Sequence, residues 1–362
     1  MLQDGVITVL GTMSGTSLDG VDAAVLHTDG RQIAGFGPSA YRPYSAAEQA
    51  VLKAHLGRWQ DADCSKAAQI VEDAHIAVMA PFADIQLAGF HGQTLAHDPG
   101  GRGTHQCGDG ARLAAALGYP VVWDFRTADV AAGGQGAPLA PFYHFALAKW
   151  IKAQAPVAFL NLGGVGNITW VNPACAAPED PAALLAFDTG PANAPMNDLM
   201  RLRHGVGYDA DGVLAAQGQA DAGILAAFMA HPYFTKSAPK SLDRDAFDGL
   251  VRAVADLPDT DALATLAAAV VQSVVAALAL CPTMPAQLLV TGGGRHNKTV
   301  MAGLARALSC AVTSVKSVGL DGDMLEAQAF AYLAVRAVRG YPLSSPQTTA
   351  VPTPLTGGRL ST

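Results

Sequence analysis

The sequence predicts an α/β fold with two domains. Apolar runs typical of strands alternate with alanine-rich stretches of helical length, which is the pattern of an α/β protein. A strand, a glycine-rich turn and a second strand follow one another near the start of the chain and again midway. The chain has 362 residues, 50% of them hydrophobic, enough to build two buried cores or one core that has split.

The elements are expected to alternate along the chain. Strands are expected at residues 7–11, 23–27, 89–91, 121–124, 157–162, 168–171, 186–188 and 288–291. Helices are expected at residues 46–56, 65–79, 110–117, 192–203, 215–231, 262–280, 299–307 and 324–339. The tail, residues 344–362, is rich in Ser, Thr, Pro and Gly, so we expect loop or extended chain there, packed or frayed.

Two of the strand pairs look like repeats of one unit. Residues 7–10 run into the glycine-rich segment 11–20 and then into an apolar run, and residues 157–162 run into 163–167 and then into another. Two such hairpins suggest a duplicated fold with a cleft between its halves. Two unrelated hairpins in an α/β protein are the alternative, and the pattern alone does not separate the two.

The charge pattern argues against some classes of partner. Only 15% of the residues are charged, the net charge is −7, and no run of Lys or Arg is longer than a pair. An acidic chain without a basic stripe is a poor candidate for binding nucleic acid or an anionic membrane. Five scattered cysteines without a C-x-x-C motif fit a reducing compartment, and the apolar run 6–10 lacks the basic flank of a signal peptide. We therefore expect a cytoplasmic protein.

One stretch is long enough to span a bilayer. Residues 262–280 contain no charged residue. They are mostly Ala and Val, they include Thr265, Gln272 and Ser273, and no Lys or Arg lies close by. A buried core helix is therefore the better interpretation.

Three glycine-rich turns each follow a predicted strand. Such a turn lets backbone N–H groups converge on an anion, because no Cβ blocks the approach and positive φ is allowed. Together they predict a nucleotide site, since α/β proteins bind nucleotides at the carboxyl ends of strands. The glycines are Gly11, Gly15 and Gly20 in the first turn, Gly163, Gly164 and Gly166 in the second, and Gly292, Gly293 and Gly294 in the third.

None of these turns is a familiar phosphate motif. The segment from Gly292 to Thr299 ends like a P-loop, but Asn297 stands where that motif requires its second glycine. The dinucleotide fingerprint G-x-G-x-x-G does not follow the first strand either. We expect phosphate to be bound in a different cradle.

Asp188 is the candidate general base. It closes an apolar run and precedes a glycine turn, so its carboxylate would face the mouth of a cleft and could take a proton from an attacking oxygen. The alternative is an ordinary N-cap for the helix expected from residue 192. The residues alone leave both open.

Several polar residues are candidates for binding a small sugar. His91, Gln93 and Thr94 follow an apolar run, and Arg126 and Asp129 precede the glycine-rich loop 133–138. Arg126 could bind a carboxylate, although a structural role for His91 and an interdomain turn at 133–138 are the alternatives. Glu326 lies in an otherwise apolar helix, where it either faces inward toward a partner or ligand, or is exposed and solvated.

An ordered set of segments resembles the anhydro-N-acetylmuramic acid kinase family. The segments are 11–22 (GTMSGTSLDGVD), 91–94 (HGQT), 125–129, 133–141 (GGQGAPLAP), 161–169 (NLGGVGNIT), 187–193 (FDTGPAN), 291–297 (TGGGRHN) and 326–331. The resemblance runs from end to end of the chain. One departure is Ala192, where the family usually has Gly; its methyl group should be tolerable if φ is negative.

The resemblance implies the actin-like, sugar-kinase and Hsp70-like ATPase fold, with ATP in a cleft between two α/β domains. We place these domains at residues 1–140 with 342–362, and at 141–341. It implies that Asp188 is the catalytic aspartate, and that Asp19 or Asp22 holds Mg²⁺ through water. It implies contacts to the ATP phosphates from Gly15, Thr16, Ser17, Leu18, Asp19, Gly20, Val21, Asp22, Gly163, Gly164, Gly166 and Asn167, and to adenosine from Gly292, Gly293 and Gly294.

The implied reaction converts 1,6-anhydro-N-acetylmuramate, ATP and water into N-acetylmuramate 6-phosphate and ADP, in peptidoglycan recycling and amino-sugar metabolism. A homodimer is expected from the family. Two other hypotheses share the fold: an ordinary hexose or carboxylate kinase, and an ATP-gated binding protein of the actin or Hsp70 kind.

Overall fold

Two β-sheets organise the chain, one in each of two units. The computed structural model describes residues 4–242 and 246–362. Unit 1 comprises Met1–Lys152, Ala176–Pro181 and Met324–Thr362, and unit 2 comprises Ala153–Cys175 and Ala182–Asp323. This grouping differs from the domain boundaries expected at 140/141 and 341/342, because α5 (Pro141–Trp150) and α11 (Leu325–Val338) contact elements of unit 1.

The sheet of unit 1 has the strand order β12-β6-β4-β1-β2-β3, with β5 paired to β4. Its strands are β1 (Ile7–Ser14), β2 (Gly20–Thr28), β3 (Ile33–Pro43), β4 (Leu87–Asp98), β5 (Gly103–Cys107), β6 (Val121–Trp123) and β12 (Arg359–Ser361). The strands β1, β2 and β3 form an antiparallel meander, while β4 runs parallel to β1 and β6 parallel to β4.

The sheet of unit 2 repeats this arrangement in the order β11-β10-β7-β8-β9. Its strands are β7 (Val157–Leu162), β8 (Val165–Val171), β9 (Leu184–Pro191), β10 (Gln287–Thr291) and β11 (Ala311–Ser314). Here too the first three strands form an antiparallel meander, and the next two run parallel to the first. Both predicted hairpins are therefore the first strand pair of the same unit, which confirms the duplicated fold and excludes two unrelated hairpins.

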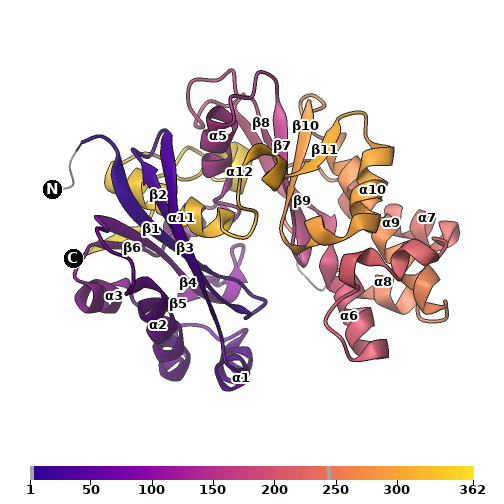
Figure 1. Ribbon diagram of the computed structural model, residues 1–362, viewed down its shortest axis with the longest axis horizontal. Helices are drawn as coiled ribbons and strands as arrows, with labels where there is room; N and C mark the ends of the chain where they lie inside the picture. The colour runs from indigo at the N-terminus through magenta and orange to yellow at the C-terminus, as the bar shows by residue number, and fades with distance from the viewer. Residues whose placement is uncertain (1–3, 243–245) are drawn as a thin grey trace. The chain divides into compact units, whose positions relative to one another are not determined.

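Successive side chains along the strands of unit 1 point to opposite faces of the sheet, and helices pack on both faces (Figure 1). Leu10 and Ala88 point into a core shared with helices α1 (Ala46–His55), α2 (Ser65–Met79) and α3 (Gly110–Leu117). Their neighbours Gly11 and Gly89 face α11 instead. A Cβ on Gly11 would lie 1.9 Å from the carbonyl oxygen of Ala327, so the helix backbone rests directly on the strand.

One face of the sheet in unit 2 packs against a large apolar core. The helices that contribute to it are α6 (Asn193–His204), α7 (Ala222–Met229), α8 (Asp248–Ala253), α9 (Asp259–Leu278) and α10 (Lys298–Ala307). Helix α9 is long and apolar enough to cross a membrane, but 67% of its most apolar window is buried within the protein. The prediction of a core helix at 262–280 is confirmed.

The helix predicted at 215–231 is wrong as a single element. The chain forms a short 3-10 turn at Ala215–Gln217 and then α7. Gly218 lies between them. A Cβ at this position would lie 2.0 Å from the carbonyl oxygen of Thr260, so the close approach of the two backbones requires glycine. Asp221 then caps α7 by accepting the N–H of Ile224 at 2.8 Å.

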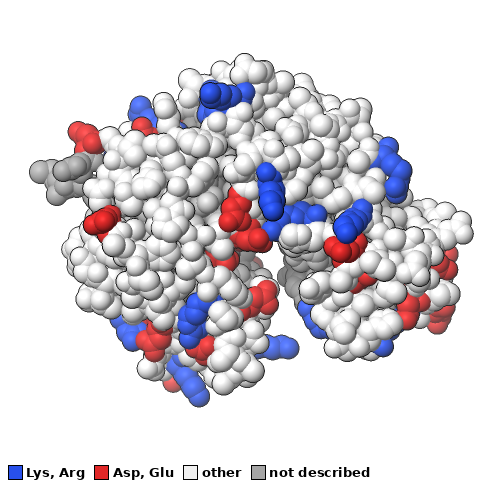
Figure 2. All heavy atoms as spheres, in the orientation of Figure 1, with Lys and Arg blue, Asp and Glu red and all other residues white. Residues whose placement is uncertain are grey.

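The C-terminal tail is packed, which settles the alternative left open by its composition. Helix α12 (Pro346–Thr349) has two buried threonines, Thr348 and Thr349, and β12 pairs antiparallel with β6. On the face drawn in Figure 2, acidic and basic side chains are interspersed and most atoms belong to other residue types, in keeping with the 15% of charged residues.

Candidate functional site

The side chain of Gln93 fixes the turn between β1 and β2 by hydrogen bonds. The Gln93 amide donates to the Gly15 carbonyl at 3.2 Å, and its Oε1 accepts the Ser14 hydroxyl at 2.6 Å. Within the turn, the N–H of Leu18 donates to the Gly15 carbonyl at 3.1 Å. Thr16, Ser17 and Asp19 are exposed, so the polar groups of a fixed turn face outward.

Not every residue of this predicted phosphate segment can use its side chain. Leu18 and Val21 are buried in the core of unit 1, which leaves only their backbone groups for a ligand. Gly20 is required by packing, since a Cβ would lie 2.4 Å from the Arg42 carbonyl oxygen. Burial and then the charges of Asp19 and Asp22 raise the pKa of Tyr41, so both carboxylates lie near one hydroxyl.

His91 and Arg126 form a hydrogen-bonded pair in unit 1. The guanidinium donates from Nε to His91 Nε2 at 3.1 Å and from Nη1 to the Gly136 carbonyl at 2.6 Å. His91 Nδ1 lies 2.8 Å from the Gly92 carbonyl, to which it donates once Nε2 is an acceptor. Burial and the neighbouring guanidinium lower the pKa of His91 well below its usual range, so the imidazole stays neutral and orients Arg126.

Asp129 is a buried structural carboxylate. Its Oδ1 accepts the N–H of Gly136 at 2.6 Å, and its Oδ2 accepts the hydroxyls of Ser344 at 2.5 Å and Thr349 at 2.7 Å. It thereby ties the loop 133–138 to the C-terminal tail. Both Asp129 oxygens have protein partners, and the predicted contact from Asp129 to the sugar stays a prediction.

Glu326 is exposed in the first turn of α11, so the inward-facing alternative is wrong. Burial lowers the pKa of Arg126 to about 10, and the charges of Glu326 and Asp129 oppose that shift. Arg126 and Glu326 thus interact within unit 1. Thr94 accepts a hydrogen bond from the Gln106 amide at 3.3 Å and is half-buried.

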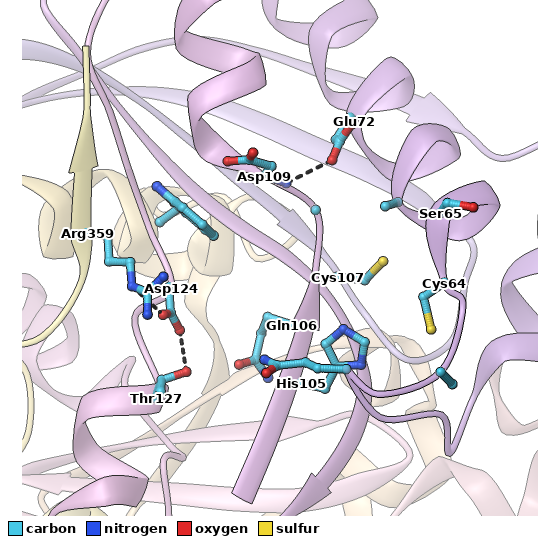
Figure 3. A pocket seen from close by; sticks show the side chains of 15 residues that line it. Cys64, Ser65, Glu72, His105, Gln106, Cys107, Asp109, Asp124, Thr127 and Arg359 are labelled. Atoms are coloured by element: carbon cyan, nitrogen blue, oxygen red, sulfur yellow. Dashed lines mark hydrogen bonds and ion pairs between the residues drawn. The ribbon is translucent and has the colours of Figure 1, made fainter.

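A cavity of about 510 Å³ in unit 1 is lined by other residues, among them Glu72, Gln106 and Asp124 (Figure 3). None of the predicted site residues lines it. Its carboxylates already have partners: Asp124 accepts from Arg359 and from the Thr127 hydroxyl, while Glu72 accepts the backbone N–H of Asp109. We therefore place the candidate site at the turns rather than in this cavity.

The second turn, between β7 and β8, is joined to the start of α6. The Gly163 carbonyl accepts the N–H of Asn193 at 2.9 Å, and the Gly164 carbonyl accepts those of Ala192 and Ala194 at 3.0 and 3.2 Å. Gly166 is required, because a Cβ would lie 2.5 Å from the Thr189 hydroxyl. The carbonyls of Gly163 and Gly164 therefore face the start of α6.

The third turn follows β10 and packs on the end of β7, beside the second turn. Gly292 has φ of +73°, and a Cβ there would lie 2.2 Å from Asn161 Oδ1. Asn297 is the N-cap of α10 and accepts the N–H of Val300 at 3.0 Å. This cap gives a physical reason for Asn at the position where a P-loop has glycine.

Asp188 lies in β9 opposite Asn167 of β8, on the strand pair that carries the second turn. A segment around residues 233–242 holds it. Its N–H donates to the Lys240 carbonyl at 3.0 Å, its carbonyl accepts the Tyr233 hydroxyl at 2.6 Å, and its Oδ2 accepts the N–H of Leu242 at 2.8 Å. Burial raises the pKa of Asp188 to about 7, against the opposing Leu242 hydrogen bond.

The capping alternative for Asp188 is wrong. The N-cap of α6 is Ala192, which has no side-chain capping bond. Its φ is −124°, so the condition set for tolerating a methyl group in place of the family's glycine is met.

Four residues around the candidate base and the two turns of unit 2 were not predicted: Tyr233, Lys240, Leu242 and Asn193. Asn193 ends the FDTGPAN segment, so its position was a signal. The other three reach Asp188 through tertiary contacts, and their local sequence carries no comparable motif. Lys240 is buried and donates to the Tyr233 carbonyl at 2.8 Å, which ties the segment to itself.

The chain is similar to known proteins along its whole length. The sequence model of a family described as anhydro-N-acetylmuramic acid kinase matches residues 7–360. The anhydro-N-acetylmuramic acid kinase of Cereibacter sphaeroides is 62% identical over 100% of this chain and 98% of its own length. That of Roseobacter denitrificans is 58% identical over 99% of this chain and 95% of its own. A dehydratase activator from Clostridium difficile aligns at 12% identity with a TM-score of 0.48, so the assignment rests on the sequence relatives.

Proposed function

Because the chain belongs to the anhydro-N-acetylmuramic acid kinase family, we propose that it uses ATP to open and phosphorylate 1,6-anhydro-N-acetylmuramate. The observation that carries the mechanism is Asp188: a carboxylate with one oxygen held by the Leu242 N–H and a pKa raised to about 7 by burial. Such a group can accept a proton near neutral pH. A cytoplasmic location and a homodimer belong to the same proposal.

The substrate has no free 6-hydroxyl, because O6 is bonded to C1. In the proposed step Asp188 takes a proton from water, and the water oxygen bonds to C1 as the C1–O6 bond breaks. O6 then bonds to the γ-phosphorus, and the bond from that phosphorus to the bridging oxygen breaks to release ADP. A glycosidase needs a second carboxyl group to protonate its leaving oxygen, whereas here the phosphoryl group captures it.

The glycine turns are assigned to the nucleotide. The amides of Gly163, Gly164, Gly166 and Asn167 are proposed to bind phosphate, and Gly292–Gly294 to lie against adenosine. In unit 1 the turn 15–22 is assigned a phosphate role through its outward amides and hydroxyls. Mg²⁺ is held in kinases by one or two carboxylates, waters and phosphates, and the neighbouring pair Asp19 and Asp22 fits that donor set. Bound there, the ion would neutralise phosphate charge.

The residues predicted to bind the sugar fall into two groups, according to the contacts that each already makes within the protein. Arg126, Thr94 and Glu326 are proposed to contact the sugar, with the guanidinium of Arg126 suited to its carboxylate. His91, Gln93 and Asp129 are proposed to act through others: His91 orients Arg126, Gln93 fixes Gly15, and Asp129 fixes the loop 133–138.

A coupled assay of ADP release tests the proposal. Purified protein with ATP should release ADP with 1,6-anhydro-N-acetylmuramate and yield N-acetylmuramate 6-phosphate by mass spectrometry. Oxygen-18 from labelled water should appear at C1 rather than in the phosphate. ADP release with free N-acetylmuramate or hexoses and none with the anhydro sugar would replace the proposal with an ordinary sugar kinase.

A further inference from the structure

We propose that Asn193 is a positioning residue that locks the second turn, Gly163–Asn167, to the third, Gly292–Gly294, so that both can bind one nucleotide. The inference rests on the proposed function, in which these two turns hold phosphate and adenosine. Asn193 touches neither the sugar nor the reacting atoms in this proposal.

Asn193 holds the end of β7 with two hydrogen bonds. Its backbone N–H donates to the Gly163 carbonyl at 2.9 Å, and its side-chain Nδ2 donates to the Leu162 carbonyl at 2.7 Å. These are consecutive carbonyls at the junction of strand and turn. With both fixed toward α6, the peptide planes that precede the turn amides are fixed as well.

The same carboxamide meets the third turn. A Cβ on Gly294 would lie 2.8 Å from Asn193 Oδ1, and one on Gly293 would lie 3.7 Å from its Nδ2. The side chain therefore fills the space between the two turns. Gly294 leaves room for it, and Gly293 lies exposed beside it, with its backbone open to a ligand.

Few side chains can replace this carboxamide. An alanine keeps the helix start but loses the bond to the Leu162 carbonyl. An aspartate keeps the shape but replaces the donor with an acceptor that repels this carbonyl, and it adds a negative charge beside a turn assigned to phosphate. Both should weaken nucleotide binding, and the aspartate more, although neither change touches the sugar.

The test measures nucleotide and sugar parameters separately. In N193A the KM for ATP, and the calorimetric Kd for a non-hydrolysable ATP analogue, should rise about tenfold, the effect of one lost hydrogen bond. In N193D both should rise further, while the KM for the anhydro sugar stays within about twofold of wild type. N172D is the matched control, because Asn172 Oδ1 accepts the N–H of Ala174 and Asp preserves that acceptor.

The outcomes separate this inference from the proposed function. Wild-type protein without ADP release would overturn the proposed function. Active wild-type protein with N193A and N193D near its nucleotide affinity would overturn the role of Asn193 alone. Equal increases in KM for ATP and sugar, following a lowered unfolding temperature, would also overturn it, because they indicate general destabilisation. N193D is isosteric, so it keeps the test valid if N193A does not fold.

Discussion

Asp188 has the contacts that a fixed base requires, since its two backbone groups and one carboxylate oxygen all have partners. Replacement by Asn keeps an oxygen that accepts the Leu242 N–H but removes the basic site. We expect kcat for ADP release to fall by about 10²- to 10⁴-fold, with the Kd for ATP near that of wild type. Turnover within about tenfold of wild type would remove Asp188 from the role.

The pH dependence should follow the same carboxylate. Burial raises the pKa of Asp188 from its ordinary value of 3.8 to about 7, and only the deprotonated form can accept a proton. Therefore kcat/KM should rise with pH through a midpoint near 7 and level off above it. A profile measured at constant ionic strength that stays flat from the acid side through neutrality would contradict the assignment.

Tyr233 supports Asp188 by a hydrogen bond to the backbone carbonyl of Asp188. Tyr233 is a buried residue, and its hydroxyl donates to the Asp188 carbonyl at 2.6 Å. Tyr233→Phe leaves this carbonyl without that donor, which should cost about 1–3 kcal/mol of unfolding free energy. We expect kcat to fall about tenfold with little change in either KM, because the base is displaced while substrate contacts remain. Tyr208→Phe, at a residue 66% exposed, is the control and should behave as wild type. An unchanged kcat in Tyr233→Phe would refute the supporting role.

The helices and strands with a clear apolar pattern in their own sequence were predicted. Those that depend on pairing or packing with distant parts of the chain were not. Strand β7 and helices α2 and α3 have the predicted bounds, since each has a clear apolar pattern and α3 is also capped by Asp109 and ended by Gly118. Strand β3 is half-exposed along much of its length and depends on pairing with β2. Helix α5 is buried over most of its length, so it has no amphipathic period to detect.

The same division holds for the candidate site. Glycine turns after strands could be located from sequence, because their chemistry and their flanking runs are local. His91, Gln93 and Asp129 could be located too, but their hydrogen bonds to Arg126, Gly15 and the loop 133–138 could not be predicted, and a direct sugar contact from each of them stays a prediction. Sequence could not distinguish these roles, since hydrogen bonds between residues far apart in the chain decide them.

The contact of β1 with α11 leaves no room for a side chain at Gly11. A Cβ on Gly11 would lie 1.9 Å from the Ala327 carbonyl oxygen and 2.4 Å from the Ala331 nitrogen, both backbone atoms that cannot rotate away. Gly11→Ala should therefore lower the unfolding free energy by about 1–3 kcal/mol or more. Gly100→Ala is the control, because nothing lies within 4 Å of a Cβ there. Equal urea midpoints for the two variants would contradict the packing described.

At the scale of the whole molecule, buried histidines in unit 1 should make the protein sensitive to acid. Burial lowers the pKa of His75 to about 4 and that of His144 to about 3, against an ordinary value of 6.5, and it shifts His91 in the same direction. Below pH 6.5 the unfolded chain therefore binds protons that the folded protein does not. The unfolding free energy therefore has its full value, as far as these histidines are concerned, above pH 6.5, and it decreases as the pH drops toward 4.

Removing one of these histidines should remove part of that dependence. Between pH 7.5 and 5.5, each buried neutral histidine should cost roughly 1.4 kcal/mol of unfolding free energy, because the unfolded side chain gains a proton over about one unit below its pKa. Urea unfolding followed by tryptophan fluorescence measures the difference, since three of the four tryptophans (Trp59, Trp123 and Trp150) lie in unit 1. In His75→Gln the loss of unfolding free energy between pH 7.5 and pH 5.5 should be smaller than in wild type by roughly 1.4 kcal/mol, whatever the variant's stability at pH 7.5. His296→Gln, at an exposed position, should keep the wild-type difference. If His75→Gln also keeps it, the folded protein binds a proton at His75 as readily as the unfolded chain, and the imidazole is not held neutral by burial.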